Sequence, residues 1–527
     1  MWTLVSRVSG LVRIVVVAAV LGPTYFANLY QAANNLPNLV YELLTGALFA
    51  SLVVPALVRH FDRGDVVAGT RLASQFLTLS VVSASLLVVI VVCAGRVVLG
   101  VLTAGVPAGA LGIGAGSAWL LLGLLMLQVP LYVCVGLAVS VQNACGRFAV
   151  AAGAPSVENG VILVVMAVYS GIFGGGEPSG QGSAEVALLG GGTTLAVLLH
   201  AAVQWWGARR CGARLVPAWR GWRNHEVWAV VRLAVPSLGY ASLSVARYLC
   251  LLVVAAAAPG AVVALAIAWA FYNLPLALVG RPVALAALPH LSRSWQSGDD
   301  VGYSETFGRT FGLAMFVSVP IGITYALLSS PLAAAITFGE MATAAGRELV
   351  RYCLLGISLG VVGQAAIELA TQAAYARRDA RRPLWAIALR TSVAVAGMVL
   401  ARALLNGPVV MLALGASVAV SDLAAGAVLH WVVTRHLPRP TISMALSLTR
   451  AVVASLPMIP VMSLLVVAAG TQRTQVANWT VVLLVGFSGA LVYLVAQWVL
   501  RSPELAGLSS LISRNKTTTD MGSAVDR

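Results

Sequence analysis

Residues 72–92 read LASQFLTLSVVSASLLVVIVV, and no charged side chain interrupts these 21 residues. An α-helix of this length rises about 30 Å, which is the thickness of the hydrocarbon core of a bilayer. The stretch lacks the alternation of polar and apolar residues that a membrane β-strand shows, and a helix satisfies its own backbone hydrogen bonds in lipid. The sequence therefore predicts a transmembrane helix here.

Similar apolar runs recur along the whole chain of 527 residues. Hydrophobic residues make up 59% of the sequence and charged residues only 10%, and the mean hydropathy is +0.91. Soluble proteins carry about 25% charged residues, so the composition excludes a soluble protein of this size. We expect an all-α integral membrane protein with about fourteen transmembrane helices. The predicted helices cover residues 2–21, 31–58, 72–102, 117–143, 152–173, 184–206, 229–257, 261–290, 305–332, 347–376, 384–405, 408–434, 444–469 and 478–500.

Basic residues are distributed unevenly between successive loops. Arginines occupy the loops that follow even-numbered helices, as in the cluster at 377–382, whereas the loops at 21–30 and 103–117 contain none. Cytoplasmic loops of membrane proteins are enriched in Arg and Lys. We therefore expect both termini in the cytoplasm. The net charge of +15 is attributed to these loops rather than to nucleic-acid binding.

Two proline-containing helices that lie six helices apart resemble each other. Residues 35–37 and 273–275 both read Asn-Leu-Pro, and each helix contains a second proline, Pro55 or Pro289. Parallel six-helix repeats are a recurrent transporter architecture with the substrate site between the halves, and chance similarity is the alternative. The predicted parts are an N-lobe at 1–206, a cytoplasmic amphipathic loop at 207–228, a C-lobe at 229–435, two further helices at 436–500 and a disordered cytoplasmic tail at 501–527.

Residues that carry chemistry are dispersed. The six histidines and six cysteines show neither HExxH nor CxxC spacing, so we expect no metal, no cofactor and no enzymatic activity. The segment 205–228 interleaves arginines with tryptophans. We expect it to lie along the inner headgroup layer, with binding of a soluble partner as the alternative.

Five short motifs occur in order along residues 2–440. They are Ser6-Arg7-Val8-x-Gly10-Leu11-Val12-Arg13, Leu36-Pro37-Asn38-Leu39, Asn143-x-x-Gly146-Arg147-Phe148, Leu288-Pro289-x-Leu291-Ser292 and Tyr375-Ala376-x-x-Asp379-x-x-x-Pro383. In this order and spacing the motifs resemble those of the MurJ/MviN lipid II flippases, in the multidrug/oligosaccharidyl-lipid/polysaccharide exporter superfamily. The resemblance implies two six-helix lobes in a V around a cationic cavity, with two extra helices that form a hydrophobic groove.

The resemblance also implies a function. A flippase of this kind would move an undecaprenyl-pyrophosphate-linked cell-wall precursor from the inner to the outer leaflet of the bacterial inner membrane by alternating access, for peptidoglycan synthesis. The implied partners are the polyprenyl-pyrophosphate-linked glycan, membrane lipids and cell-wall synthesis proteins. Two alternatives stay open: export of another lipid-linked oligosaccharide or a drug-like amphiphile, and a cell-wall scaffold that does not transport.

Charged residues inside the predicted helices are candidates for substrate binding, because guanidinium groups bind phosphate oxygens in pairs and a buried Arg needs a partner or a task. Of the cationic set that the resemblance implies, Arg7 and Arg13 are present, whereas Asn28 stands at an acidic position and Tyr41-Glu42 at a basic pair. Arg247 is expected to contact phosphate, or else to pair with an acid such as Glu42. The predicted substrate-binding residues are thus Arg7, Arg13, Asn28, Glu42 and Arg247.

Two further residues are candidates for ion coupling or gating. Glu368 and Glu42 are carboxylates in core helices, where they can couple transport to protons or sodium. Arg281 lies between Gly280 and Pro282, a pair of helix breakers that indicates a hinge. For three other charged residues we expect structural roles: Glu158 and Asp422 as buried acids, and Arg390 as an anchor near the inner membrane face.

Overall fold

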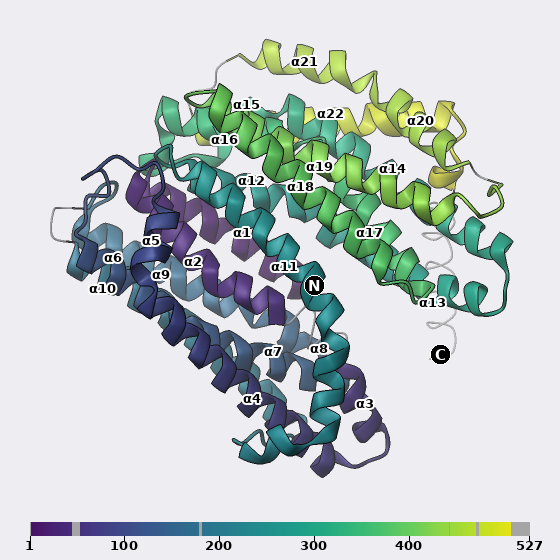
Figure 1. Cartoon of the computed structure of the whole chain (residues 1–527). Coiled ribbons are helices and arrows are strands. Elements are labelled where there is room, and N and C mark those ends of the chain that lie inside the picture. Colours follow the sequence, from purple (N-terminus) through teal and green to yellow (C-terminus); the bar gives the residue numbers. More distant parts are fainter. Residues whose placement is uncertain (1, 45–52, 179–181, 442, 471–473, 507–527) are drawn as a thin grey trace, which may run out of the picture. The chain divides into compact units, whose positions relative to one another are not determined.

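The computed structural model shows an all-helical chain (Figure 1) and describes residues 2–44, 53–178, 182–441, 443–470 and 474–506. Twelve helical segments in these ranges are long and apolar enough to cross a membrane, or thirteen if the pair α16 (Ala344–Ile357) and α17 (Gly360–Ala376), bent by 44°, counts as one span. The predicted class is confirmed. The predicted helix at 31–58 is not among these spans: its described first part belongs to α2 (Tyr25–Leu44), which is rich in asparagine and too polar to be counted, and its residues 45–52 lie outside the described residues.

The chain divides into two compact units. The first unit consists of residues 1–270, 337–350 and 395–411, and the second of residues 271–336, 351–394 and 412–527. The predicted boundaries of the N-lobe and C-lobe rest on the sequence repeat rather than on this division, and they stay a prediction.

The first unit is built around α10 (Ser183–Arg210), which packs against α6, α7 and α9. Glycines on α10 allow this close approach: a Cβ on Gly192 would lie 2.7 Å from Val165 of α9, and one on Gly190 would lie 3.0 Å from Leu124 of α6. The helical elements of this unit are α1 (Trp2–Leu21), α2 (Tyr25–Leu44), α3 (Val54–Asp62), α4 (Val66–Cys93), α5 (Gly95–Leu102), α6 (Ala115–Met126), α7 (Gln128–Ala144), α8 (Phe148–Gly153), α9 (Pro155–Phe173), α10, η2 (Trp219–Arg223), α11 (His225–Ala255), most of α12 (Ala261–Pro275) and η4 (Gly339–Ala342).

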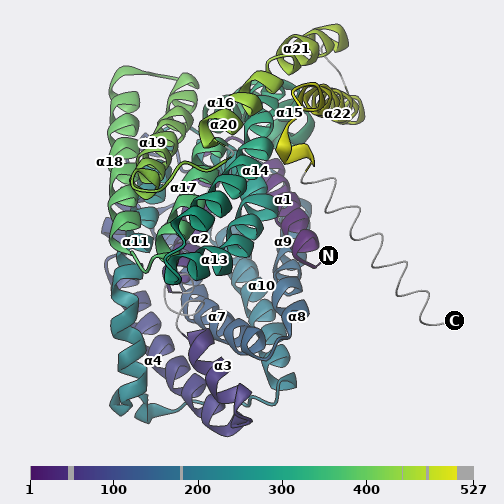
Figure 2. The ribbon, with the colours of Figure 1, turned by 90° about the vertical axis from the view of Figure 1, so that its right-hand side faces the viewer.

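The second unit is centred on α14 (Asp300–Leu327), which packs against α13, α17 and α20. Gly356 and Gly415 bring α16 and α19 together, because a Cβ on Gly415 would lie 2.8 Å from the backbone of Gly356. The remaining elements are η3 (Leu276–Gly280), α13 (Arg281–Gln296), α15 (Ser329–Ile336), α18 (Arg381–Leu404) up to residue 394, α19 (Val409–Thr434) from residue 412, α20 (Met444–Ser455), α21 (Met458–Ala469) and α22 (Gln475–Val499). Figure 2 shows the ribbon of the chain after a quarter turn.

The two copies of the predicted repeat end in the same local structure. Gly64 and Gly298 both adopt a positive φ, of 76° and 72°. Each is followed by an aspartate whose side chain accepts a hydrogen bond from the first turn of the next helix, Asp65 from Ala68 N–H and Asp299 from Gly302 N–H. Glycine thus follows the end of one helix and aspartate is the N-cap of the next, which are the positions that these two residues usually occupy.

Helix boundaries differ from the predicted ones at several places. α10 continues to Arg210 and α11 begins at His225, so the predicted loop at 207–228 is helical at both ends. Between them, the backbone is fixed to α4, since Val216 N–H donates to Ser74 Oγ at 3.2 Å and Ala218 N–H to Thr78 Oγ1 at 2.7 Å. The ring of Trp219 stays exposed. Most of the predicted tail, residues 507–527, lies outside the described residues.

Candidate functional site

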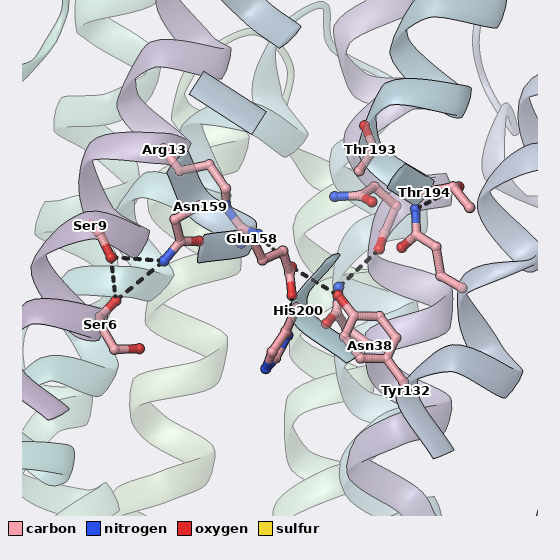
Figure 3. A network of polar contacts seen from close by, with 12 residues as sticks. Ser6, Ser9, Arg13, Asn38, Tyr132, Glu158, Asn159, Thr193, Thr194 and His200 are labelled. Atoms are coloured by element: carbon pink, nitrogen blue, oxygen red, sulfur yellow. Dashed lines mark hydrogen bonds and ion pairs between the residues drawn. The ribbon is translucent and has the colours of Figure 1, made fainter. Parts of the chain in front are cut away.

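Four helices of the first unit bring a basic, an acidic and two aromatic side chains together (Figure 3). Arg13 of α1 donates from Nη1 to Glu158 Oε1 of α9, over 3.1 Å. The hydroxyl of Tyr132 on α7 donates to the same oxygen over 3.0 Å. His200 of α10 places Nδ1 2.8 Å from Glu158 Oε2. The carboxylate is thus the point at which α1, α7, α9 and α10 meet.

The members of this network differ in their exposure. Glu158 is 6% exposed and His200 4%, whereas the side chain of Arg13 is 22% exposed. A buried carboxylate is stable only when it is paired and hydrogen-bonded, and here three groups satisfy it. Arg13 is therefore the more accessible partner of the ion pair.

Two buried amides extend the network from His200 toward the ends of α7 and α10. Gln204 Nε2 lies 3.4 Å from His200 Nε2 and donates to Ala151 O at 3.1 Å. Gln204 Oε1 accepts a hydrogen bond from Gln142 Nε2 at 2.7 Å. Gln142 and Gln204 are both fully buried. A continuous polar path thus runs from Arg13 through Glu158, His200 and Gln204 to Gln142.

A second group of contacts ties α1 to α9 on the other side of Arg13. Asn159 Nδ2 donates to Ser9 Oγ at 2.9 Å and lies 3.4 Å from Ser6 O. Ser9 Oγ in turn donates to Ser6 O at 3.1 Å. Glu158 and Asn159, which are neighbours on α9, therefore both bind α1, and together they hold the part of α1 that carries Arg13 (Figure 3).

The other predicted binding residues of the first unit lie in different environments. Arg7 and Glu42 are exposed. Arg247 is 4% exposed, and its guanidinium carbon lies 5.6 Å from the centroid of the Trp269 ring, within the range of a cation–π interaction. Of the predicted substrate-binding residues, Arg13 contacts Glu158 directly in the part of the chain that the structure describes. Whether these residues contact substrate stays a prediction.

Asn28 is buried and binds the turn between α11 and α12. Its Nδ2 donates to Ala258 O at 2.6 Å and lies 3.4 Å from Ala256 O, and its Oδ1 accepts from Val262 N–H at 2.9 Å. Both ends of the amide are therefore used within the protein.

Two charged residues of the second unit, Arg390 and Asp422, form a buried ion pair. Asp422 of α19, which is 0% exposed, accepts hydrogen bonds from Arg390 Nε of α18 and from the hydroxyl of Tyr272. Arg390 was expected to anchor at the inner membrane face, and this expectation is wrong: the residue is 7% exposed and forms an ion pair with Asp422. Depth along a helix predicts distance from the interface, but it does not predict which face of the helix a side chain occupies.

The predicted coupling and gating residues have fewer described contacts. Glu368 is half-buried and accepts a hydrogen bond from Gln372 Nε2 of its own helix at 3.4 Å. Arg281 is exposed and follows η3, a π-helical turn, directly. This π-helical turn lies between Pro275 and Pro282, and the predicted hinge stays a prediction. No group of three His, Cys, Asp or Glu in the described ranges has the geometry to hold a metal ion.

Tyr132, Gln142, His200 and Gln204 were not predicted as site residues. Their signal in the sequence is weak, because single polar residues in apolar helices are common. The spacing of His200 and Gln204, four residues apart on α10, places them on one face of the helix. This spacing was the feature of the sequence that could have predicted a shared polar site.

Charged residues that pair inside a bundle of membrane-spanning helices are common in transporters, where they mark substrate or ion pathways. Solved structures show the same fold. The chain resembles a lipid II flippase MurJ in an inward closed conformation, with a TM-score of 0.74 and 17% identity, over 94% of this chain and 97% of that one. It also resembles an inward-facing multidrug resistance MATE family transporter of the MOP superfamily, with a TM-score of 0.64 and 13% identity, over 82% and 98%.

Sequence comparisons identify the family. The family model described as lipid II flippase MurJ matches residues 17–488. The probable lipid II flippase MurJ of Vibrio cholerae is 28% identical over 397 residues, which is 72% of each chain, and that of Rhizobium tropici is 25% identical over 394 residues, which is 74% of this chain and 72% of the relative. The chain belongs to the MurJ family of lipid II flippases, as a divergent member. Members of this family are multi-pass membrane transporters rather than enzymes, which confirms the predicted class.

Proposed function

We propose that this chain moves an undecaprenyl-pyrophosphate-linked cell-wall precursor, lipid II or a close relative of it, from the inner to the outer leaflet by alternating access. The observation that carries the proposal is the match of the MurJ family model to residues 17–488, which spans nearly all of the described helices. The fold resemblance over 94% of the chain agrees with it.

The chemistry of the first unit supports a phosphate-bearing substrate. A pyrophosphate group in a low-dielectric environment needs fixed cations, and arginine offers two parallel hydrogen bonds to phosphate oxygens. Arg13 combines a fixed position with partial exposure, because Glu158 holds one side of its guanidinium group while 22% of the side chain stays accessible. Arg7, six residues earlier on α1, and Arg247 on α11 are further cations of the same unit.

The distribution of basic residues supports an inner-membrane orientation with both termini in the cytoplasm. On this orientation, the pyrophosphate headgroup enters from the cytoplasmic side, and Arg7 lies nearer that side than Arg13 on α1. Cell-wall synthesis proteins that produce or consume the precursor are the expected partners.

Complementation tests the function directly. The gene is expressed in a bacterium whose own lipid II flippase is depleted, and lipid II on the outer leaflet is measured with a hydrolase added outside the cells. Growth and accessible lipid II are expected to return. Growth failure of a correctly inserted protein, with lipid II retained on the inner leaflet, would contradict the proposal and would favour a different exported amphiphile or a scaffold.

A further inference from the structure

The network around Glu158 accepts only one distribution of protons. Arg13, the Tyr132 hydroxyl and His200 Nδ1 surround the two carboxylate oxygens at 2.8–3.1 Å. The guanidinium group can only donate, and the phenol hydroxyl donates to Oε1. A guanidinium cation within hydrogen-bond distance of Oε1 favours the charged form of the carboxyl group. Glu158 is therefore ionised in this arrangement.

The amides beyond His200 fix its tautomer. Gln204 Nε2 donates to Ala151 O, and Gln204 Oε1 accepts from Gln142, so both outer contacts require the same orientation of the Gln204 amide. In this orientation an NH₂ group faces His200 Nε2, which consequently accepts. The imidazole proton is on Nδ1, where it donates to Glu158. His200 thus donates through Nδ1 and accepts through Nε2 in this arrangement.

The network consequently carries one positive and one negative charge, on Arg13 and Glu158. The other titratable groups that face it are phenols: Tyr132 on α7, and on α2 Tyr41, whose ring centroid lies 5.2 Å from that of Tyr132, and Tyr30, which binds Thr193 at 2.8 Å. Phenols are uncharged at neutral pH. In the described surroundings of the network, removal of Arg13 therefore leaves Glu158 without a cation.

We infer that the Glu158–His200 pair is a proton-binding site, and that a proton taken up there replaces Arg13 when Arg13 turns to the phosphate of a bound headgroup. The inference rests on the proposed function, because it takes a lipid-linked pyrophosphate as the ligand of Arg13. Arg13 is the exposed member of the network, so a headgroup competes with Glu158 for it. An ionised carboxylate left in a buried site without its cation is costly, and a proton from water removes that charge.

Protonation also has a structural consequence that the present contacts define. A proton on His200 Nε2 meets the NH₂ group of Gln204, so Gln204 has to turn and break its bond to Ala151 or to Gln142. A turned Gln204 amide places its NH₂ group against Gln142 Nε2, so Gln142 has to turn as well. This brings Gln142 Oε1, which is buried without a hydrogen-bond partner in the described contacts, toward Gln204. The amides thereby transmit the protonation state to the ends of α7 and α10.

Binding and protonation are linked reciprocally. A headgroup that draws Arg13 away raises the proton affinity of the pair, and a proton on the pair raises the affinity of Arg13 for the headgroup. Affinity for a pyrophosphate therefore increases as pH falls, by up to about tenfold per pH unit in the range where one proton is taken up.

Calorimetry of the full-length protein in detergent tests the inference. Geranyl pyrophosphate is titrated at one pH in two buffers of different ionisation enthalpy, which counts the protons taken up. Wild-type protein is expected to take up more protons per bound ligand than Glu158→Gln. Protons that the ligand itself takes up are the same for both proteins, so they cancel in the difference between the two values. Glu185→Gln is the matched control. Glu185, on α10, is buried like Glu158 and likewise accepts a hydrogen bond from a tyrosine, Tyr169, at 3.3 Å. It is expected to match wild type.

The outcomes separate the inference from the proposed function. Binding with equal proton uptake in wild type and Glu158→Gln overturns the proton site and leaves the flippase function standing. Absence of binding by wild-type protein overturns both. Should Glu158→Gln fail to fold, His200→Asn, which keeps a donor toward Glu158, replaces it: this variant is expected to flatten the pH dependence of Kd, and an unchanged pH dependence overturns the inference.

Discussion

Asn28 Oδ1 accepts a hydrogen bond from Val262 N–H over 2.9 Å, although the two residues are 234 positions apart in the chain. With Nδ2 bound to Ala258 O, one side chain of α2 holds the turn that joins α11 to α12. Gly260 in this turn has a φ of 73°, and a Cβ there would lie 2.3 Å from Pro23, so the turn fits closely over the start of α2. The junction depends on an amide that donates and accepts at once.

Replacement of Asn28 by aspartate should destabilise this junction. Asn28→Asp keeps the acceptor for Val262 but turns a second oxygen toward Ala258 O, which removes one hydrogen bond and adds repulsion. Loss of a satisfied buried group costs about 1–3 kcal/mol, so the thermal midpoint of the purified protein should fall. Asn406→Asp, at an exposed loop position, is the control and should leave it unchanged. Equal midpoints for the two variants would contradict the account.

The buried ion pair of the second unit should depend on both partners. Arg390→Met leaves the fully buried carboxyl group of Asp422 without its cation, which is expected to cost about 3–5 kcal/mol of unfolding free energy. The double variant Arg390→Met with Asp422→Leu removes both charges and should recover most of this loss. Unfolding of the single and double variants in denaturant, with a double-mutant cycle, measures the coupling. Additive losses would show that the two residues do not act as a pair.

The buried amides of Gln142 and Gln204 should leave no room for a side chain at Gly207. A Cβ on Gly207 would lie 2.5 Å from Gln142 Oε1, whereas one on Gly191 of the same helix would meet no atom within 4 Å. Gly207→Ala is therefore expected to destabilise the protein by about 1–3 kcal/mol. Gly191→Ala should be neutral or slightly stabilising, since alanine favours the helix. A thermal scan of both variants decides, and equal stability would mean that Gln142 yields without cost.

Cys145, at the end of α7, should react slowly with alkylating reagents. Burial raises the pKa of its thiol to about 12, with the neighbouring thiol of Cys211 as a further cause. The thiolate is the reactive form, so the alkylation rate at pH 8 should be roughly 10³-fold below that of an ordinary thiol and should rise tenfold per pH unit until about pH 12. Mass spectrometry after iodoacetamide treatment measures this, with exposed Cys93 as the comparison. Rapid labelling of Cys145 at pH 8 would contradict the burial.

The sequence was sufficient for the class of fold but not for the pairing of its charges. Apolar runs are a local property, so nearly all membrane-spanning helices were predicted to within several residues. The start of α2 was missed by six residues, although Thr24, which caps it by accepting from Ala27 N–H at 3.0 Å, was a readable signal. Arg13 and Glu158 were each noticed as intramembrane charges, but they lie 145 positions apart. Nothing local in a sequence shows which distant helix faces which.

Transport by the purified protein tests the central claim most directly. Fluorescent lipid II is placed in proteoliposomes, and a quencher added outside measures the rate at which the label changes leaflet. Wild-type protein should raise this rate at least tenfold over empty liposomes, Arg13→Gln should abolish most of the gain, and Arg402→Gln, at an exposed position of α18, should retain it. A wild-type rate equal to that of empty liposomes, or full activity of Arg13→Gln, would contradict the account.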